Sequence, residues 1–359
     1  AKNYEAVAVV VDPADYGQVL EELKNNGELS LATRRRLAAK AFAHTAAYDA
    51  AIAAYFQQLI GSEKFFPSNY IYRGEKVQDL RYGENPHQRA AFYRLPQAPP
   101  NSIAGARQLQ GKELSYNNIL DLDAAWNLVC DFSETVVAII KHTNPCGVAR
   151  AETPAAAYRL AYSADPVSAF GGIVAVNRPV DGEMAAEMQK IFLEAVIAPD
   201  FTPEALEILK TKANLRLLAT GAAERQGTDL QLRTVSGGLL VQEVDKHVLN
   251  PDNLKIVTAR EPSAEEQEDL FFAWQVVKHV KSNAIVVVKN GVTLGIGAGQ
   301  MNRVGAAKIA LEQAGDRAEG AVLASDAFFP FGDTVTEAAK AGIVAIIQPG
   351  GSIRDEESI

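Results

Sequence analysis

The chain has 359 residues, of which 48% are hydrophobic and 22% are charged, as in an ordinary globular protein long enough for two or three domains. Its net charge of -9 argues against nonspecific nucleic-acid binding, although a few arginines in a pocket could still hold a small anion. The sequence shows no apolar run of about 18 residues and no signal-peptide pattern, so we expect neither a membrane-spanning nor a secreted protein. Cys130 and Cys146 are too few for a disulfide framework and lack zinc-ligand spacing, so we expect a cytoplasmic protein without a catalytic metal.

The first thirty residues predict a strand and a helix. Val7–Val11 is a short β-branched run and is expected to form a buried strand that ends at Asp12-Pro13. Residues 14–25 have the pattern of a helix, and Asn26-Gly27 is expected to end it. This part of the chain is therefore expected to be α/β.

A long alanine-rich helix is predicted next. Ser30 is expected to cap it, and the apolar spacing continues to Ile60, with Gly61 in the position that follows a helix end. Residues 65–69 (FFPSN) are typical of a linker. We therefore place a domain boundary near residue 67.

Beyond this boundary, short runs of branched residues alternate with helical patterns. The runs are 136–140, 173–176, 285–288, 321–324 and 343–347. Continuous apolar runs of this length are typical of strands that are buried on both faces of a sheet. The fold class that we expect is therefore α/β, with helices layered on the sheet.

Two stretches of this region resemble each other weakly. Residues 163–172 (SADPVSAFGG) and 325–333 (SDAFFPFGD) each lie downstream of a strand that ends in a lysine and a polar residue. These strand ends are Lys141-His142 and Lys289-Asn290. Chance similarity between turns would explain this, and so would duplication of one α/β unit. We favour duplication, with a site where the two units meet.

Lys141 and His142 open the polar segment KHTNPCG (141–147), directly after the strand predicted at 136–140. Ligands of open α/β sheets bind beyond the carboxyl ends of strands. A histidine can accept a proton near neutral pH, and a neighbouring ammonium favours the neutral form of an imidazole. From the residues alone, a solvated loop explains the segment equally well.

Two further polar segments are candidates for ligand binding. RYGENPHQ (81–88) contains an arginine that could hold a phosphate and a glycine, Gly83, that would allow close backbone approach. Asn283 precedes the strand predicted at 285 and could donate to an oxyanion or hold a carboxamide. An irregular surface loop and a turn at a helix end are the respective alternatives.

A glycine-rich segment and an arginine follow. Gly295 to Gly299 (GIGAG) lacks the spacing of a dinucleotide-binding loop, so we expect these glycines to let the backbone pass close to a ligand or another chain. Arg303 is expected at the start of a helix through Ala314, where helix amides favour anions. This region is therefore a second candidate for a ligand contact.

Three aromatic residues lie beside a carboxylate in FFPFGD (328–333). Phenylalanine rings with Asp333 would suit a flat heteroaromatic ring that can stack and donate hydrogen bonds. A core aromatic cluster with a helix-capping aspartate is the alternative. The sequence contains no zinc-deaminase signature, phosphate-binding loop or nucleophile elbow.

Six segments together resemble one family. They are RYGENPHQ (81–88), GKELSYNNILDLDAAW (111–126), KHTNPCGVA (141–149), SADPVSAFGGIVAVNR (163–178), KSNAIVVVKNGVTLGIGAGQMNR (281–303) and ASDAFFPFGDT (324–334). In this order they are similar to the bifunctional purine-biosynthesis family, AICAR transformylase/IMP cyclohydrolase. The resemblance extends over nearly the whole chain.

The resemblance implies an architecture. Residues 68–359 would form an α/β transformylase domain of two cytidine-deaminase-like, three-layer units, about 68–240 and 241–359, without zinc. Residues 1–67 would be the C-terminal remnant of a methylglyoxal-synthase-like cyclohydrolase domain. The family also implies a homodimer with its site at the interface, and some relatives bind a structural monovalent cation. Against the family pattern, both ends of the chain look truncated.

The resemblance also implies roles for residues. His142 would be the proton acceptor, Lys141 its electrostatic helper and Asn283 the group that holds the carboxamide or the developing oxyanion. The residues that would contact the nucleotide AICAR are Arg81, Tyr82, Asn117, Phe170, Gly171, Glu194, Arg303 and Phe328. Those that would surround the folate are Val304, Phe328, Asp333, Ser352 and Ile353. Glu194 replaces an aspartate found in some relatives.

These roles imply direct formyl transfer from 10-formyltetrahydrofolate, the co-substrate, without a covalent enzyme nucleophile. Lys2 matches a lysine of the cyclohydrolase site whose partner residues are absent, so we expect ring closure to be lost. The alternative is a fragment that binds nucleotide and folate and dimerises without full activity, because the family's C-terminal segment is lacking. A zinc deaminase is a more distant alternative.

Overall fold

The computed structural model describes residues 1–60, 66–96, 98–223 and 230–359. Gly61 and Phe65, which the sequence placed at a helix end and in a linker, lie outside these ranges. The chain divides into two compact units, Ala1–Glu75 and Lys76–Ile359. Each unit is described by itself below.

The first unit is built on two helices that the sequence predicted. A 3-10 helix η1 (Pro13–Asp15) leads into α1 (Tyr16–Asn26), and α2 covers Leu31–Ile60. Gly27 ends α1 in the left-handed conformation, with φ of 74°, and Ser30 Oγ accepts a hydrogen bond from Thr33 N at 3.2 Å. Both ends were therefore predicted by local sequence rules that the structure confirms.

The predicted strand at Val7–Val11 is wrong. Residues 7–12 have no regular secondary structure, and no ladder to another described strand includes them. A β-branched run favours extended backbone, but only hydrogen bonds to a neighbouring strand make it a strand.

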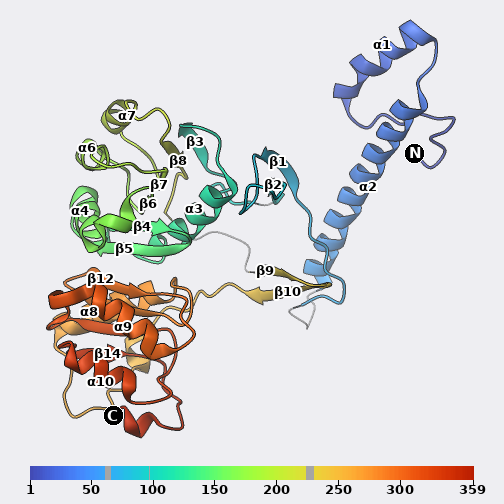
Figure 1. Ribbon diagram of the computed structural model, residues 1–359. Coiled ribbons are helices and arrows are strands. Elements are labelled where there is room, and N and C mark those ends of the chain that lie inside the picture. The colour runs from blue at the N-terminus through green and yellow to red at the C-terminus, as the bar shows by residue number, and fades with distance from the viewer. Residues whose placement is uncertain (61–65, 97, 224–229) are drawn as a thin grey trace. The chain divides into compact units, whose positions relative to one another are not determined.

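The second unit contains a large mixed sheet. Within the described ranges, ten strands lie in the order β14-β13-β11-β12-β5-β4-β6-β7-β8-β3 (Figure 1). Their bounds are β3 (Arg107–Gln110), β4 (Val136–Lys141), β5 (Asn144–Arg150), β6 (Ile173–Val176), β7 (Ala195–Ala198), β8 (Arg216–Ala219), β11 (Ile285–Lys289), β12 (Val292–Gly297), β13 (Val322–Ser325) and β14 (Ala345–Ile347). The pairs β6–β7, β7–β8 and β13–β14 are parallel and the other pairs are antiparallel. The five predicted strands are all present, in β4, β6, β11, β13 and β14.

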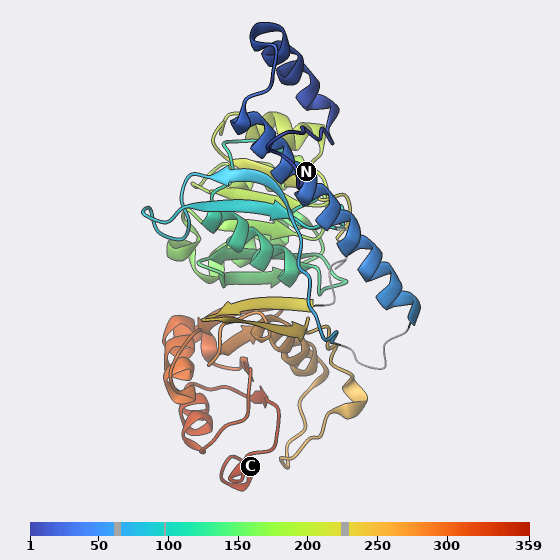
Figure 2. The same ribbon diagram turned by 90° about the vertical axis from the view of Figure 1, so that its right-hand side faces the viewer.

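Two separate ribbons accompany the large sheet. One pairs β1 (Glu75–Leu80) with β2 (Ala90–Arg94), and the other pairs β9 (Leu230–Val235) with β10 (Gly238–Glu243). Figure 2 shows both as two-stranded ribbons outside the large sheet. Short 3-10 helices, η2 (Pro251–Asn253), η3 (Gly315–Ala318) and η4 (Asp355–Glu357), complete the second unit.

Helices cover both faces of the large sheet. On one face α3 (Tyr116–Val129) and α8 (Ala264–Val277) share a buried apolar cluster with alternate residues of β4 and β11, such as Val136 and Val286. The residues between them, such as Val137 and Val287, pack on the opposite face. The helices of that face are α4 (Pro154–Ala164), α6 (Gly182–Met188), α7 (Pro203–Leu209), α9 (Arg303–Ala314) and α10 (Asp333–Lys340), with the short α5 (Pro166–Ala169) after α4. The unit thus has three layers, and Figure 1 shows α4, α6 and α7 across the strands from α3.

The two halves of the sheet repeat one order of elements. The series α3, β4, β5, α4, β6, α6, β7 is matched by α8, β11, β12, α9, β13, α10, β14, with the same strand pairings. Both α3 and α8 begin at a serine capping box, Ser115 and Ser263, and the two hairpins shift register at the same step. Residues 115–149 therefore correspond one to one with residues 263–297, at a constant separation along the chain.

The two halves meet at a narrow seam between β5 and β12. A single ladder pair, Ala149 with Val292, joins these strands. Beside it, Thr293 Oγ1 accepts a hydrogen bond from Val148 N at 2.9 Å and donates one to Val148 O at 3.2 Å. Arg150 N donates to Gly291 O at 2.9 Å. The buried side chain of Thr293 thus makes hydrogen bonds to β5 that backbone groups would make in a longer ladder.

The expectation that Gly295 and Gly297 face a ligand or another chain is wrong. Both lie in β12, where a Cβ would stand 1.9 Å from the carbonyl oxygens of Ala310 and Ala306 of α9. Gly147 of β5 is equally close to α4, because a Cβ there would stand 2.0 Å from Ala161 O. These glycines let the strands pack against the chain's own helices.

Candidate active site

Most of the predicted transformylase residues lie at one end of the large sheet. Strand β4 leaves the sheet there, at Lys141, while the antiparallel β6 and the parallel β7 and β8 enter it. In the second half, β11 enters and β12, β13 and β14 leave at this same end. We call it the site end. Its loops and helix starts carry Lys141, His142, Phe170, Gly171, Glu194, Asn283, Arg303 and Phe328.

His142 and Thr143 form the turn of a tight hairpin. Lys141 pairs with Asn144, so only two residues connect β4 to β5, with φ of 53° at His142 and 62° at Thr143. The solvated loop that we held as the alternative at 141–147 is therefore mostly strand, because Asn144 to Gly147 belong to β5. Positive φ at both central residues matches the twist of a hairpin, but it is an unusual conformation for a β-branched threonine.

The side chains around this turn hold its backbone. Asp121 Oδ1 accepts a hydrogen bond from Thr143 N at 2.6 Å. Thr143 Oγ1 and Asn144 Nδ2 both donate to His142 O, at 2.7 and 3.1 Å. These three hydrogen bonds fix the backbone of the turn. The turn is exposed and carries the imidazole of His142.

Lys141 reaches across to the loop before β6. Its Nζ donates to Phe170 O at 2.9 Å, and Gly171, with φ of 72°, donates from its N to Phe192 O at 2.8 Å. Phe170 is 60% exposed, and its ring lies 5.5 Å from the ring of Phe192. Lys141, Phe170 and Gly171 are thus brought together.

A cavity of about 250 Å³ lies beside the turn. Its lining combines residues of both halves, namely Lys141, His142, Asn144, Pro145, Cys146, Asp165, Ser168, Ile296, Ala298 and Gln313. Burial, with the charge of Asp165, raises the pKa of Cys146 to about 12, and its Sγ donates to Ile139 O at 3.3 Å. Cys146 is therefore a protonated thiol at neutral pH and does not serve as a nucleophile there.

A second cavity, of about 430 Å³, gathers five of the predicted residues. It is lined by Asn283, Arg303, Val304, Phe328 and Asp333, together with Met301, Asn302, Ala327, Pro330 and Phe331. Phe328 and Phe331 are 45% and 49% exposed, whereas Phe329 is buried in the core. The aromatic segment thus does both things that the sequence suggested, with two rings open to a ligand and one in the core. Asp333 is not the helix cap, because Gly332 occupies that position and Asp333 begins α10.

The polar groups of this second cavity are only partly engaged. Asn283 follows a cis peptide bond after Ser282, and its Nδ2 donates to Gln300 O at 2.7 Å. Arg303 begins α9 as expected, is 7% exposed and pairs with Asp326. The buried Nε of Arg303 has no hydrogen-bond partner within the described ranges. An oxygen-rich ligand could satisfy it.

Hydrogen bonds connect the two cavities. Asn144 Oδ1 accepts from Lys281 N at 3.0 Å, and Lys281 O accepts from Gly299 N at 2.6 Å. Asn283 N and Gln300 O are 3.2 Å apart in the same pair of segments. The hairpin turn of the first half is thereby tied to the loop that positions Asn283 in the second.

The remaining predicted residues of the second unit lie outside the linings of both cavities. Arg81 and Tyr82 follow β1, with the guanidinium 5.7 Å from the ring centroid, and Asn117 Nδ2 donates to Glu84 O at 3.4 Å. This loop thus lies at the start of α3. Glu194 Oε2 accepts from Arg216 Nη1 at 2.7 Å, so its carboxylate already has a cationic partner.

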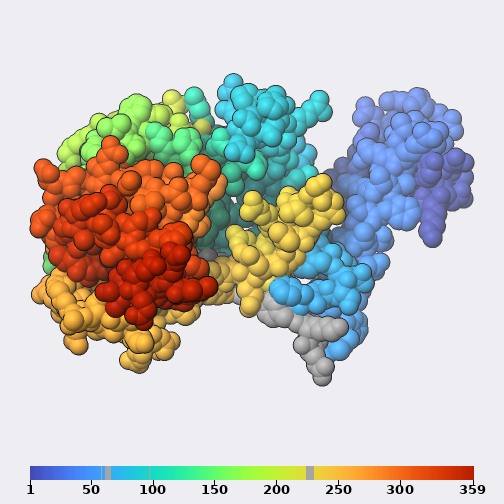
Figure 3. Space-filling model, turned by 60° about the horizontal axis from the view of Figure 1, so that its bottom comes forward, coloured from blue at the N-terminus to red at the C-terminus, as the bar shows by residue number. Residues whose placement is uncertain are grey.

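The C-terminal turn carries Ser352 and Ile353, and neither lines the second cavity. Ile353 is fully exposed, and Ser352 Oγ accepts from Arg354 N at 3.1 Å. The guanidinium of Arg354 stands 5.0 Å from the ring of Phe331, which lines the second cavity. Figure 3 shows this last segment, in dark red, lying on the rest of the second half. In the first unit, Lys2 is exposed in the opening turn.

A larger cavity lies elsewhere. It has a volume of about 650 Å³, and its lining includes Tyr93, Trp126, Cys130 and His279 but none of the predicted site residues. Size alone would select this cavity. The candidate acid–base, amide and arginine groups converge on the two smaller ones, and we therefore assign the site to those.

Sequence reasoning missed the residues that hold the site together. Asp121, Asn144 and Gln300 fix the turn and the Asn283 loop, yet none was singled out. Asp121 did carry a signal, because DLDAAW (121–126) matches DLFFAW (269–274) in the second half. This match is part of the repeat of the two halves, but the repeat predicted from the sequence did not include it.

Two features are absent from the residues that the structure describes. There, no group of three or more His, Cys, Asp or Glu side chains is arranged to hold a metal ion. Nor does any helix in those ranges have the length and apolar character needed to cross a membrane.

The chain matches known proteins over most of its length. The family model described as "AICARFT/IMPCHase bienzyme" matches residues 1–313. The chain belongs to this family. A relative from Anoxybacillus flavithermus, named "Bifunctional purine biosynthesis protein PurH", is 60% identical over the whole chain, which covers 70% of that relative. Relatives of the same name from Bacillus cereus and Bacillus thuringiensis are 58% identical with the same coverage.

Membership of the AICARFT/IMPCHase family confirms the resemblance drawn from six segments. The matched range contains the hairpin turn, the Asn283 loop and Arg303. The aromatic segment at 328–333 lies beyond that range but within the full-length identity to the relatives.

Proposed function

We propose that the protein transfers a formyl group from 10-formyltetrahydrofolate to AICAR in purine biosynthesis. The observation that carries this proposal is the exposed His142 on a fixed turn, beside a cavity that both halves line, in a member of the AICARFT/IMPCHase family. The family name supplies the substrates, and the geometry supplies the groups that the reaction needs.

The reaction requires help because the acceptor amine is a poor nucleophile. Its lone pair is conjugated with the imidazole ring and carboxamide, so attack on the formyl carbon needs proton removal and close positioning of both substrates. In our proposal His142 takes the amine proton as the new C–N bond forms. The bond from the formyl carbon to N10 of the folate then breaks, and this proton passes to N10, so that tetrahydrofolate leaves. Lys141 stabilises negative charge, and Asn283 holds the carboxamide or the developing oxyanion. Transfer is direct, and the protonated Cys146 has no role as a nucleophile.

We assign the nucleotide and the folate to the other residues that the family resemblance named. The nucleotide contacts are Arg81, Tyr82, Asn117, Phe170, Gly171, Glu194, Arg303 and Phe328. The folate contacts are Val304, Phe328, Asp333, Ser352 and Ile353. The 430 Å³ cavity with its exposed Phe328 and Phe331 supports a flat ring at this place.

We further propose that the transformylase domain, residues 68–359, consists of two cytidine-deaminase-like units, about 68–240 and 241–359. The repeated order of helices and strands supports a duplication. Residues 1–67 would belong to a methylglyoxal-synthase-like cyclohydrolase domain. A homodimer with a shared site, a cytoplasmic location and a structural monovalent cation remain predictions of the resemblance.

A transfer assay with AICAR and 10-formyltetrahydrofolate tests the main proposal. We expect His142→Ala to abolish transfer while AICAR binding, followed by calorimetry, largely survives. Asn290→Ala is the matched control, because it removes the side chain at the corresponding turn of the second half. Normal turnover by His142→Ala would contradict the role of His142 as base.

Two other outcomes separate the alternatives. Binding of nucleotide and folate by the wild-type chain without any transfer would favour the binding fragment. Ring closure is measured separately, by following conversion of the formylated nucleotide to IMP. Closure at a rate that Lys2→Ala abolishes would show that the first unit keeps its activity.

A further inference from the structure

Asp121 holds the turn that presents His142. It lies in α3, the helix before the hairpin, and its Oδ1 accepts the Thr143 N–H at 2.6 Å. A carboxylate that accepts a backbone N–H makes one of the stronger protein hydrogen bonds. Asp121 therefore contacts the catalytic turn from a helix that is itself anchored in the core.

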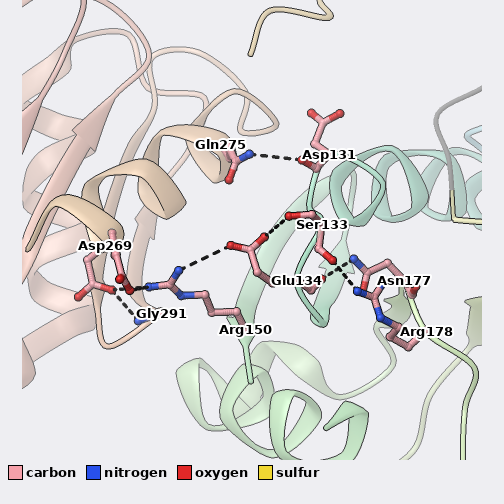
Figure 4. Close-up of polar contacts among 10 residues, drawn as sticks. Asp131, Ser133, Glu134, Arg150, Asn177, Arg178, Asp269, Gln275 and Gly291 are labelled. Atoms are coloured by element: carbon pink, nitrogen blue, oxygen red, sulfur yellow. Dashed lines mark hydrogen bonds and ion pairs between the residues drawn. The ribbon is translucent and has the colours of Figure 1, made fainter. Parts of the chain in front are cut away.

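The second half contains the same arrangement. Asp269 occupies the position in α8 that Asp121 occupies in α3, and it accepts hydrogen bonds from Asn290 N and Gly291 N, both at 2.7 Å. Figure 4 shows Asp269 beside Gly291, with Arg150 reaching toward the same carboxylate. A helix aspartate that binds a hairpin turn is thus a feature of the repeat, present once in each half.

The two turns differ in their residues. Asn290-Gly291 is the pair that such turns favour, because asparagine and glycine accept positive φ at little cost. His142-Thr143 is not such a pair, and a β-branched residue at φ of 62° is a conformational outlier. Outliers of this kind persist only where surrounding contacts enforce them, and they gather at functional sites.

The position of the two turns matches this difference. Because β5 and β12 are antiparallel, the two turns lie at opposite ends of the sheet. The turn with the favoured residues lies at the end of the sheet opposite to the predicted site, beside Arg150, whose N donates to Gly291 O. The turn with the strained residues lies at the site end, beside the 250 Å³ cavity.

Resting on the proposed function, we infer that Asp121 is a positioning residue for formyl transfer. Its carboxylate keeps Thr143 in the left-handed conformation and so aims the His142 imidazole at the acceptor amine. Asp121 itself need not touch either substrate. In the second half, Asp269 makes the equivalent bonds to a turn that would form without them.

The test is a set of variants compared by kcat and KM. We expect Asp121→Ala to lower kcat by about 10-fold to 100-fold, the size of effect that a misplacement of about 1 Å can have, while both KM values change less than about 2-fold. Asp121→Asn keeps an acceptor oxygen and should lose less. Thr143→Gly, added to Asp121→Ala, should recover most of the loss, because glycine adopts positive φ without help.

Asp269→Asn is the control at the opposite end of the sheet. It should lower the melting temperature, because Asp269 is buried, and leave kcat unchanged. Unchanged kcat in Asp121→Ala would overturn the inference, and so would a loss that Thr143→Gly fails to relieve. A rise of KM alone would instead mean that Asp121 acts in binding, which also contradicts it.

Amide hydrogen exchange gives a readout that does not need turnover. The Thr143 amide should be protected in the wild-type chain and exchange faster in Asp121→Ala, while the Gly291 amide stays protected in both. Absence of transfer by the wild-type chain would contradict the proposed function, not the inference. An unprotected Thr143 amide in the wild-type chain would overturn the inference alone.

Discussion

Replacing Gly297 with alanine tests whether close packing of β12 on α9 shapes the second cavity. A Cβ at this position would lie 1.9 Å from Ala306 O, whereas real Cβ atoms almost never approach closer than 3.0 Å. Helix α9 must therefore retreat from β12 by about 1 Å. Arg303 and Val304 lie three and two residues before Ala306, within one turn of this helix, so a wall of the cavity moves with it.

We expect two measurable consequences. Overpacking of this kind costs about 1–3 kcal/mol, which for a unit of this size lowers the melting temperature by about 2–5 °C. Displacement of Val304 and Arg303 should also raise the KM for the folate, measured by steady-state transfer assays. Thermal unfolding and kinetics on the same preparation separate the two effects.

Gly238→Ala provides the control. Gly238 lies in β10, and the nearest heavy atom to an added Cβ is Val235 Cγ2 at 3.4 Å, an ordinary contact. This variant should match the wild type in melting temperature and KM. An unchanged melting temperature in Gly297→Ala, or an equal fall in Gly238→Ala, would refute the packing argument.

Three further predictions concern the seam, an ion pair and the buried thiol. Thr293→Val should lower the free energy of unfolding by about 1–3 kcal/mol in urea titrations, because valine keeps the shape but leaves the buried Val148 N–H without its acceptor. Burial alone would raise the pKa of Asp131, but the hydrogen bonds and charges of His279 and Lys278 together outweigh it and hold the pKa well below its usual range. The stabilising contribution of Asp131 is therefore full at neutral pH and falls as the pH drops below about 4, so Asp131→Asn should be less stable at pH 7 and less sensitive to acid. With its pKa raised to about 12 by burial, Cys146 should react with iodoacetamide at pH 8 only after unfolding, as peptide mass spectrometry can show.

Each of these three predictions has an outcome that would contradict it. Wild-type stability in Thr293→Val would mean that Val148 N–H finds another acceptor. If Asp131→Asn and the wild type lost stability equally as the pH fell, the depressed pKa of Asp131 would be contradicted. Rapid labelling of Cys146 in the folded protein would contradict its burial.

The sequence predicted five mostly apolar strands but missed β7, which is equally apolar, and the strands that contain glycine, proline or polar residues. Strand β5 contains Pro145 and Gly147, and β12 contains Gly295 and Gly297, residues that are rare inside strands. Their pairing partners and the helices behind them make these segments strands. Asn290-Gly291 was a hairpin signal that could have revealed β12 from sequence alone.

Only the site residues that lie in recognisable sequence motifs could be predicted. Matching segments identified the residues of the second cavity, and five of them line it together. The contacts that fix the turn join residues far apart in the chain, as when Lys281 N donates to Asn144. Such contacts depend on how the two halves meet, which no local pattern specifies.

The seam has a consequence for how the chain folds as it is synthesised. All ladder partners of β3, β4, β6, β7 and β8 lie within residues 107–219, so the first half can complete its sheet before β12 leaves the ribosome. Until then β5 is an edge strand, open to pairing with another nascent chain. Pro145 offers no N–H there, and the register shift opposite Ile139 and Ile140 makes the edge irregular. The residues that directly follow the His142 turn thus protect the unfinished protein from aggregation until its second half arrives.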